Sequence, residues 1–252
     1  MVKILAVTNQ KGGVGKTTTS VNLAASLAAT DKQVLLIDLD PQANATMGSG
    51  TNKLTVKHTV YQVLLGEISI ESVRVNNLQA KYDLIPSNRE LAGAEVEMVA
   101  LPKRETRLKT ELSKIENEYH YIIIDCPPAL NLLTLNGLCA AHAVMIPMQC
   151  EYYALEGLSD LVNTIKKVRT KFNPKLRIEG LLRTMFDPRN ILAQQVSDQL
   201  QQHFGNKVYR TVIPRNVRLA EAPGFGIPVL YHDRQSKGAQ AYLELAKEVL
   251  NV

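Results

Sequence analysis

The chain lacks most features of secreted and membrane proteins. It has only three cysteines, Cys126, Cys139 and Cys150, and no C-x-x-C pair. An odd number without that spacing favours reduced thiols in a cytoplasm over a disulfide framework or a zinc site. No run of eighteen apolar residues occurs, so the sequence predicts no transmembrane helix. The N-terminus also lacks the order of a secretory signal. We therefore expect a cytoplasmic protein.

Linkers and repeats are also missing. No tract rich in Pro, Gly or Ser, no low-complexity segment and no internal repeat divides the 252 residues. The apolar content of 45% and charged content of 21% are ordinary for a globular protein with a substantial core. Length alone would allow one large or two small domains. The uninterrupted pattern favours a single domain over residues 1–252.

The charge is distributed unevenly along the chain. Residues 1–164 hold 14 Lys and Arg against 17 Asp and Glu, whereas residues 165–252 hold 15 against 7. A basic C-terminal third suggests a polyanion partner such as nucleic acid. Ordinary solvated lysines and arginines would explain the same counts, so charge alone leaves both interpretations open.

Short apolar runs alternate with helical patterns. The runs are β-branched and nearly unbroken, which is typical of strands covered on both faces; they are Lys3–Thr8, Gln33–Asp38, Tyr82–Pro86, Tyr121–Asp125, Ala143–Pro147 and Arg177–Thr184. The helical patterns are Lys16–Ala29, Lys103–Glu118, Leu155–Phe172, Ile191–Phe204 and Ala239–Asn251. This alternation predicts an α/β fold, with a mostly parallel twisted sheet and helices on both faces. Gly48–Asn77 is the least regular part, and we expect surface loops with a short helix there.

Residues 9–18 form a glycine-rich loop between the first predicted strand and helix, and they read N-Q-K-G-G-V-G-K-T-T. Glycines let successive N–H groups point at a phosphate, and the helix adds the positive end of its dipole. Lys16 can then reach the β- and γ-phosphates, and the Thr17 hydroxyl can ligate magnesium. A glycine turn without a ligand would not explain this order. We predict ATP and Mg²⁺ as ligands of Lys11, Gly12, Gly13, Val14, Gly15, Lys16, Thr17 and Thr18.

The loop departs from the common pattern G-x-x-x-x-G-K-[ST]. Gln10 stands where that pattern has glycine, and Lys11 adds a lysine inside the loop. The form K-G-G-x-G-K-T resembles the deviant Walker A motif of the ParA/MinD family of P-loop NTPases. The resemblance implies that Lys11 crosses a dimer interface to the nucleotide of a second copy. A cation supplied in trans would stabilise charge on the transferring phosphoryl group.

Acidic residues follow two of the apolar strands. V-L-L-I-D-L-D-P ends in Asp38 and Asp40, and Y-I-I-I-D-C-P-P contains Asp125. Because ligands of open α/β sheets bind beyond the carboxyl ends of strands, these acids should converge on the loop. An acid after a strand can also be a helix cap. We interpret Asp125 as the Walker B acid and predict a metal site of Thr17, Asp40 and Asp125. Asp40 matches the family residue that positions the attacking water, which makes Lys11, Lys16 and Asp40 the predicted catalytic residues; Asp38 would support the magnesium shell and the loop.

Five blocks extend the likeness over nearly the whole chain. They are N-Q-K-G-G-V-G-K-T-T-T, L-I-D-L-D-P-Q-A-N-A-T, Y-I-I-I-D-C-P-P, Q-C-E-Y-Y-A-L-E-G-L and V-I-P-R-N-V-R-L-A-E-A-P, and together they resemble chromosomal ParA (Soj-type) partition ATPases. The resemblance implies an ATP-dependent homodimer, associated with the nucleoid, that binds double-stranded DNA without sequence preference. A ParB-type partner would stimulate its slow hydrolysis, and the cycle would move chromosomes or plasmids apart.

The resemblance also assigns residues in the basic third. Pro214 and Asn216 lie in a block like the family's adenine-contacting loop. Family arginines that bind DNA phosphates match Arg189 and Arg218. Arg215 lies in the same block as Arg218, and Arg234 and Lys237 are weaker candidates that complete the predicted DNA-binding set. Each of these cations could instead form a surface ion pair. The chain departs from the family pattern at Arg183 and Pro188, where the family more often has an apolar and a small residue, respectively. Arg183 would alter either the nucleotide pocket or the basic surface.

Other functions on this scaffold fit the sequence less well. A MinD-like membrane-surface ATPase is the main alternative, but the last predicted helix carries two acids and one lysine rather than a basic amphipathic face. An iron–sulfur reductase needs cysteine ligands, and no cysteine precedes Cys126. A metabolic ligase is not excluded by fold. Because the sequence starts at its first strand, without a helix-turn-helix extension, we expect DNA binding without base readout and no membrane binding.

Overall fold

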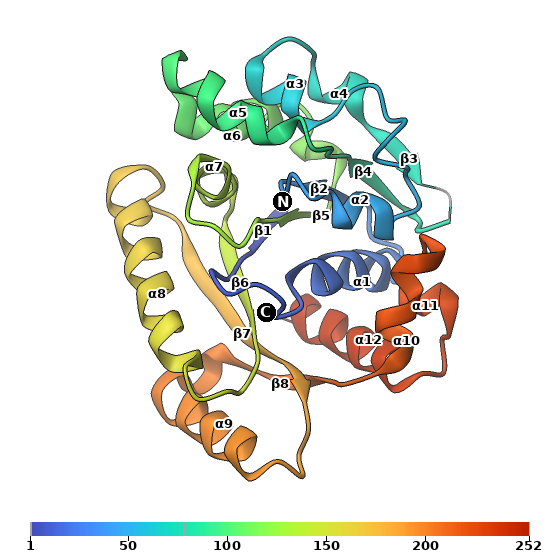
Figure 1. The fold of residues 1–252 in the computed structure, drawn as a ribbon, viewed down its shortest axis with the longest axis vertical. Coiled ribbons are helices and arrows are strands. Elements are labelled where there is room, and N and C mark those ends of the chain that lie inside the picture. The colour runs from blue at the N-terminus through green and yellow to red at the C-terminus, as the bar shows by residue number, and fades with distance from the viewer. Residues whose placement is uncertain (1, 78, 252) are drawn as a thin grey trace.

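An eight-stranded sheet forms the frame of the computed structural model, which describes residues 2–77 and 79–251 (Figure 1). The strand order is β3-β4-β2-β5-β1-β6-β7-β8. All neighbours are parallel except β3 and β4. The strands are β1 (Lys3–Val7), β2 (Val34–Asp38), β3 (Val75–Asn77), β4 (Tyr82–Ile85), β5 (Tyr121–Asp125), β6 (Ala143–Met148), β7 (Arg177–Phe186) and β8 (Val208–Pro214). Met1, Leu78 and Val252, which belong to the predicted domain, lie outside the described residues.

Both faces of the sheet are covered by helices. Alternate residues of β1 point to different cores: Ile4 and Ala6 to one, Leu5 and Val7 to the other. The Leu5 face packs against α1 (Lys16–Ala28), α2 (Asn44–Gly48), α10 (Val217–Glu221), α11 (Val229–His232) and α12 (Lys237–Leu250). The Ile4 face packs against α3 (Val60–Leu65), α4 (Ile70–Val73), α5 (Leu91–Glu97), α6 (Arg107–Leu112), α7 (Leu132–Ala140), α8 (Ala154–Lys171) and α9 (Ile191–Phe204). Two cores explain why the strands are apolar without alternation.

The predicted α/β fold with a mostly parallel sheet is confirmed. All six predicted strands are present, with small shifts at their ends. The predicted strands did not include β3 and β8, which are the two edge strands. In β8, Arg210 is exposed and Thr211 and Val212 are only partly buried. An edge strand needs no apolar run on both faces, so it has a weaker signal.

The prediction of one helix over Lys103–Glu118 is wrong. Only α6 is α-helical there, and 3₁₀ turns flank it at Arg104–Thr106 and Glu116–Glu118. Leu108, Leu112 and Ile115 are buried, so the spacing that suggested a long helix is satisfied by a short helix and a turn. Gly48–Asn77 is also more ordered than expected, since it contains α3, α4 and β3.

The strand order places β1 between β5 and β6 at the centre. In register, Val7 pairs with Asp125, and Asp38 also pairs with Asp125. The carboxyl ends of β1, β2 and β5 therefore meet at one edge of the sheet, where the glycine loop begins.

Candidate functional site

The loop between β1 and α1 curls at the N-terminus of α1. Gly13 and Gly15 have left-handed φ angles of 74° and 86°, a conformation that costs other residues about 1–2 kcal/mol. Gly15 is the N-cap of α1 and provides no side-chain cap. The first N–H groups of the helix are thus left for another acceptor, and with the helix dipole they favour an anion.

Lys16 is held inside this loop. It is 7% exposed, and its Nζ donates to the carbonyl oxygen of Lys11 at 2.9 Å. Burial lowers the pKa of Lys16, and the nearby charges of Asp125 and Asp40 partly oppose this shift. A partly desolvated ammonium beside free helix N–H groups suits a phosphate.

Asp125 anchors the start of α1 from the end of β5. Its Oδ2 accepts from the Thr17 hydroxyl at 2.8 Å, and its Oδ1 accepts from the Ser20 hydroxyl at 2.8 Å. The carboxylate is completely buried. Burial raises the pKa of Asp125, and the negative charge of Asp38 raises it further. A buried carboxylate with a second acid beside it favours a bound cation.

Asp38 is satisfied by protein groups. Its Oδ2 accepts from the backbone N–H and the hydroxyl of Thr46, both at 2.8 Å, and its Oδ1 accepts from the N–H of Asp40 at 3.1 Å. Burial raises the pKa of Asp38 to about 6. These bonds tie the end of β2 to α2, so Asp38 positions the loop that carries Asp40.

Asp40 lies at the opening of this cluster. It is 9% exposed; its Oδ1 accepts from the N–H of Gln42 at 2.9 Å, and its carbonyl accepts from the Ser87 hydroxyl at 2.8 Å. Its charge acts on both Lys16 and Asp125. The structure thus brings Asp40 to the loop, as the strand ends predict.

These side chains fit a magnesium ion that is bound together with a nucleotide. Thr17 and Asp125 offer hydroxyl and carboxylate oxygens, which are ligands of hard cations. Across residues 2–77 and 79–251, no three His, Cys, Asp or Glu side chains gather into a metal cage. Mg²⁺ is usually held by one or two carboxylates, phosphates and water.

Lys11 has a different environment from Lys16. Its ammonium pairs with Glu151, just after β6, with Nζ and Oε2 2.5 Å apart. The two side chains are 49% and 48% exposed. The backbone N–H of Lys11 donates to Asn9 Oδ1 at 3.0 Å, which fixes the start of the loop. Lys11 therefore lies on the rim of the site, open to solvent.

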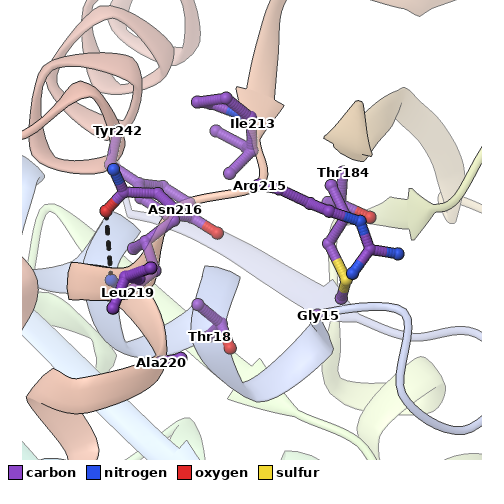
Figure 2. A pocket seen from close by; sticks show the side chains of 12 residues that line it. Gly15, Thr18, Thr184, Ile213, Arg215, Asn216, Leu219, Ala220 and Tyr242 are labelled. Atoms are coloured by element: carbon purple, nitrogen blue, oxygen red, sulfur yellow. Dashed lines mark hydrogen bonds between the residues drawn. The ribbon is translucent and has the colours of Figure 1, made fainter. Parts of the chain in front are cut away.

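A pocket of about 400 Å³ opens beside the glycine loop (Figure 2); we call it the base pocket because the predicted adenine residues line it. Pro214 and Asn216 line it together with Gly15 and Thr18. Asn216 caps α10, and its Oδ1 accepts from the N–H of Leu219 at 3.2 Å. The tertiary structure thus joins the predicted adenine residues to the phosphate loop, although some 200 residues separate them in sequence.

Three further residues of this pocket were not predicted. Thr184 donates its hydroxyl to the Val14 carbonyl at 2.7 Å, which braces the loop against β7. Met185 follows with a positive φ of 50°. Tyr242 of α12 lines the pocket, and its hydroxyl lies 3.1 Å from that of Thr19. Thr184 ends a predicted strand, so its position was a usable signal; nothing in the sequence marks Tyr242.

The predicted DNA-binding cations fall into two groups. Arg189 and Arg215 follow the carboxyl ends of β7 and β8, and Arg215 lines the base pocket beside Thr184 (Figure 2). The other three, Arg218, Arg234 and Lys237, lie on α10, before α12 and at its first residue. All five are exposed.

Two of these arginines have carboxylate partners in the chain. Arg189 makes two bonds to Asp187, at 3.0 and 2.8 Å. Arg218 pairs with Glu221 at 2.8 Å and Asp233 at 3.3 Å. Both arginines therefore form the surface ion pairs that were the alternative to DNA binding. A DNA phosphate would have to replace their acidic partners.

Arg183 does not line the base pocket. Its guanidinium donates to the Ser197 hydroxyl at 2.9 Å and to the carbonyls of Tyr209 and Arg210 at 2.9 and 3.1 Å. Because side chains alternate along β7, Thr184 faces the loop and Arg183 faces α9 and β8. Arg183 thus ties elements together at the sheet edge.

The chain is similar to proteins of known family. The family model described as "AAA domain" matches residues 2–178. Sporulation initiation inhibitor protein Soj of Bacillus subtilis (strain 168) is 53% identical over 249 residues, which cover 99% of this chain and 98% of Soj. Chromosome partitioning protein ParA of Caulobacter vibrioides (strain NA1000 / CB15N) is 48% identical over 252 residues, covering 99% and 94%. Among solved structures, cobyrinic acid a,c-diamide synthase from Mycobacterium smegmatis with bound ADP and magnesium has a TM-score of 0.88 and 38% identity, covering 99% and 94%.

Proposed function

The chain belongs to the ParA/Soj family of chromosome-partitioning ATPases, and from this premise we propose that it is an ATP-dependent dimerising switch. In this proposal the ATP-bound dimer binds DNA without sequence preference and partitions chromosomes or plasmids with a ParB-type partner. The observation that carries the proposal is the position of Lys11. Its exposed ammonium lies on the rim of a complete phosphate loop, where a second copy can approach.

ATP and Mg²⁺ are the proposed ligands. The N–H groups of residues 12–18 and the ammonium of Lys16 would hold the phosphates, and Thr17 with Asp125 would hold the metal, with Asp40 close by. Pro214 and Asn216 would contact the base. Bound magnesium would neutralise charge on the phosphates.

Three side chains divide the catalytic work. The buried Asp40 accepts from Gln42 through one oxygen, which leaves the other for a water molecule. Lys16 would stabilise phosphate charge within the chain. Lys11 of the second copy would add a cation where charge develops, so the site would be complete only in the dimer.

DNA binding is the third part of the proposal. Arg189 and Arg218 are exposed and flank the nucleotide edge, but each is paired with acids. Phosphate contacts by such arginines give sequence-independent, salt-sensitive affinity. The proposed location is the nucleoid.

A membrane function is less well supported. No helix among the described residues has the length and apolar character needed to cross a bilayer. The apolar stripe of α12 is already used, since Tyr242, Leu245, Ala246 and Val249 are buried in the core. A MinD-like use of this helix would require unpacking it.

DNA co-sedimentation with ATP, ADP or no nucleotide, run in parallel with anionic lipid vesicles, tests the proposal. We expect DNA pelleting with ATP only and no vesicle binding; the reverse would establish the membrane alternative. Arg218→Glu should weaken pelleting, while Lys247→Glu on α12, also an exposed ion-paired cation, should not.

Light scattering of Asp40→Ala in ATP and magnesium tests the dimer. We expect a stable dimer, because ATP would bind without being hydrolysed; a monomer at saturating ATP contradicts the proposal. Basal turnover should be slow, whereas many turnovers per second without DNA or partner would indicate a metabolic ligase.

A further inference from the structure

A groove of about 700 Å³ runs between α7, α8 and the turn that follows α5, on the sheet face opposite α1. It shares no lining residue with the base pocket. We propose that this groove docks a short amphipathic segment of a partner protein, one that combines apolar side chains with carboxylates.

Apolar side chains open to solvent line the groove. Val99 is 58% exposed, Leu130 52% and Phe172 36%. They come from three separate segments, the turn after α5, the loop before α7 and the end of α8, and they meet in one groove. Scattered apolar residues on a surface are normal, but a gathered set in a concave site is typical of recognition.

The α8 side of the groove is positively charged. Lys167 and Lys171 are one helical turn apart and both line it. Among the described residues neither forms an ion pair, whereas Arg104 is paired with Glu105 at 3.2 Å. Two cations without partners beside exposed apolar groups favour a segment with carboxylates.

The wall of the groove opposite α8 needs a hydrogen-bond donor. Glu95 lines the groove, and its Oε1 is buried without a hydrogen-bond partner. A buried acceptor without a donor is unfavourable. The segment should therefore carry a donor, such as an arginine, on the flank that meets Glu95, and carboxylates on the flank that meets α8.

DNA fits this groove less well than a peptide does. A phosphate backbone would use the two lysines but would leave the apolar side chains and Glu95 unused, and the Glu95 carboxylate would repel it. An amphipathic helix uses all three features, with apolar residues at i, i+3, i+4 and i+7.

The test uses the full chain without nucleotide, so its result is independent of the ATPase proposal. The probe is a fluorescent synthetic peptide with a leucine stripe, glutamates on one flank and one arginine on the other; the control peptide has lysine for each glutamate. We expect the acidic probe to bind by fluorescence anisotropy and the control not to bind.

Two charge-reversal pairs locate the site. Lys167→Glu with Lys171→Glu should weaken the acidic probe roughly tenfold or more, since like charges then face each other. Lys166→Glu with Arg169→Glu makes the same charge change on exposed residues of α8 outside the groove, and should leave binding within about twofold. Leu130→Gln should also weaken the probe.

Other results overturn the inference. Equal loss with both pairs would mean general attraction by a basic surface. Binding of both peptides, or of neither, would remove the proposed complementarity. Loss of ATP-dependent DNA pelleting with Lys167→Glu and Lys171→Glu alone would reassign the groove to nucleic acid.

Discussion

In the proposed dimer, Lys11 would have to leave a partner in its own chain before it reached a second copy. The ion pair with Glu151 is half exposed on both sides, and pairs of this kind contribute about 0–1 kcal/mol. The ion pair would therefore oppose formation of the proposed dimer only weakly. This ion pair could not be predicted from the sequence, because Glu151 is 140 residues away from Lys11.

We predict that Glu151→Gln favours the ATP-bound dimer. Removing the acid frees Lys11, and the dissociation constant should fall by up to about fivefold for each lysine. Sedimentation across protein concentrations measures it. Glu156→Gln, also exposed and close in sequence, is the matched control; an unchanged or weaker dimer with Glu151→Gln contradicts the prediction.

We predict that Thr184→Val loosens the phosphate loop. The change removes the donor to the buried Val14 carbonyl, and an unpaired buried carbonyl costs about 1–3 kcal/mol. Part of that cost should appear as weaker binding of a fluorescent ATP analogue. Thr211→Val loses a hydroxyl bond to Glu248 away from the loop, so it should lower stability but not affinity. Equal affinity of the two variants would exclude Thr184 from the site.

At the scale of elements, α12 joins the nucleotide site to the C-terminal end of the chain. It packs along α1 and β8, and Tyr242 connects its hydroxyl to Thr19 inside the core. A helix that lines the base pocket and fills the core is not available for a surface role. This placement explains the amphipathic pattern of α12, whose apolar side chains pack into the core.

We predict that Tyr242→Phe lowers stability by about 1 kcal/mol, since one buried hydrogen bond is lost without a large cavity. Denaturant unfolding should show a lower midpoint with an unchanged slope. Tyr152→Phe is the control, because Tyr152 is 73% exposed. A wild-type midpoint for Tyr242→Phe would show that the hydroxyl contact is not stabilising.

At the scale of the whole molecule, the parallel topology divides the basic third. Lys166, Lys167, Arg169 and Lys171 lie near the end of α8, which leads into the amino end of β7. The DNA candidates Arg189 and Arg215 follow the carboxyl ends of β7 and β8. These six cations therefore lie at opposite ends of the parallel strands, and a single basic face does not hold them all.

We predict that residues 1–252 unfold as one domain. The central strand β1 is bonded to β5 and β6 from the middle of the chain, so no cut of the chain separates two sheets. Far-ultraviolet circular dichroism and tyrosine fluorescence should follow one coincident transition. Two separated transitions would indicate two domains.

The fold class and the phosphate loop were predictable from the sequence, because both depend on local patterns. Apolar strands, alternating helices and the order Gly15, Lys16, Thr17 are readable over a few residues. The acids at the ends of β2 and β5 were also predictable, since parallel strands end at the same edge of a sheet. The edge strands and the extent of α6 were not, because partial exposure and short turns weaken the apolar period.

Which distant side chains meet was not predictable from the sequence and depends on the packing of the whole chain. Tyr242 at the base pocket, Glu151 beside Lys11 and the groove along α8 all join residues far apart in sequence. Their positions follow from the strand order and the packing of helices on two faces, and no local pattern encodes that order. The residues that give the phosphate loop its chemistry can therefore be recognised in the sequence, whereas the residues around the loop depend on the fold.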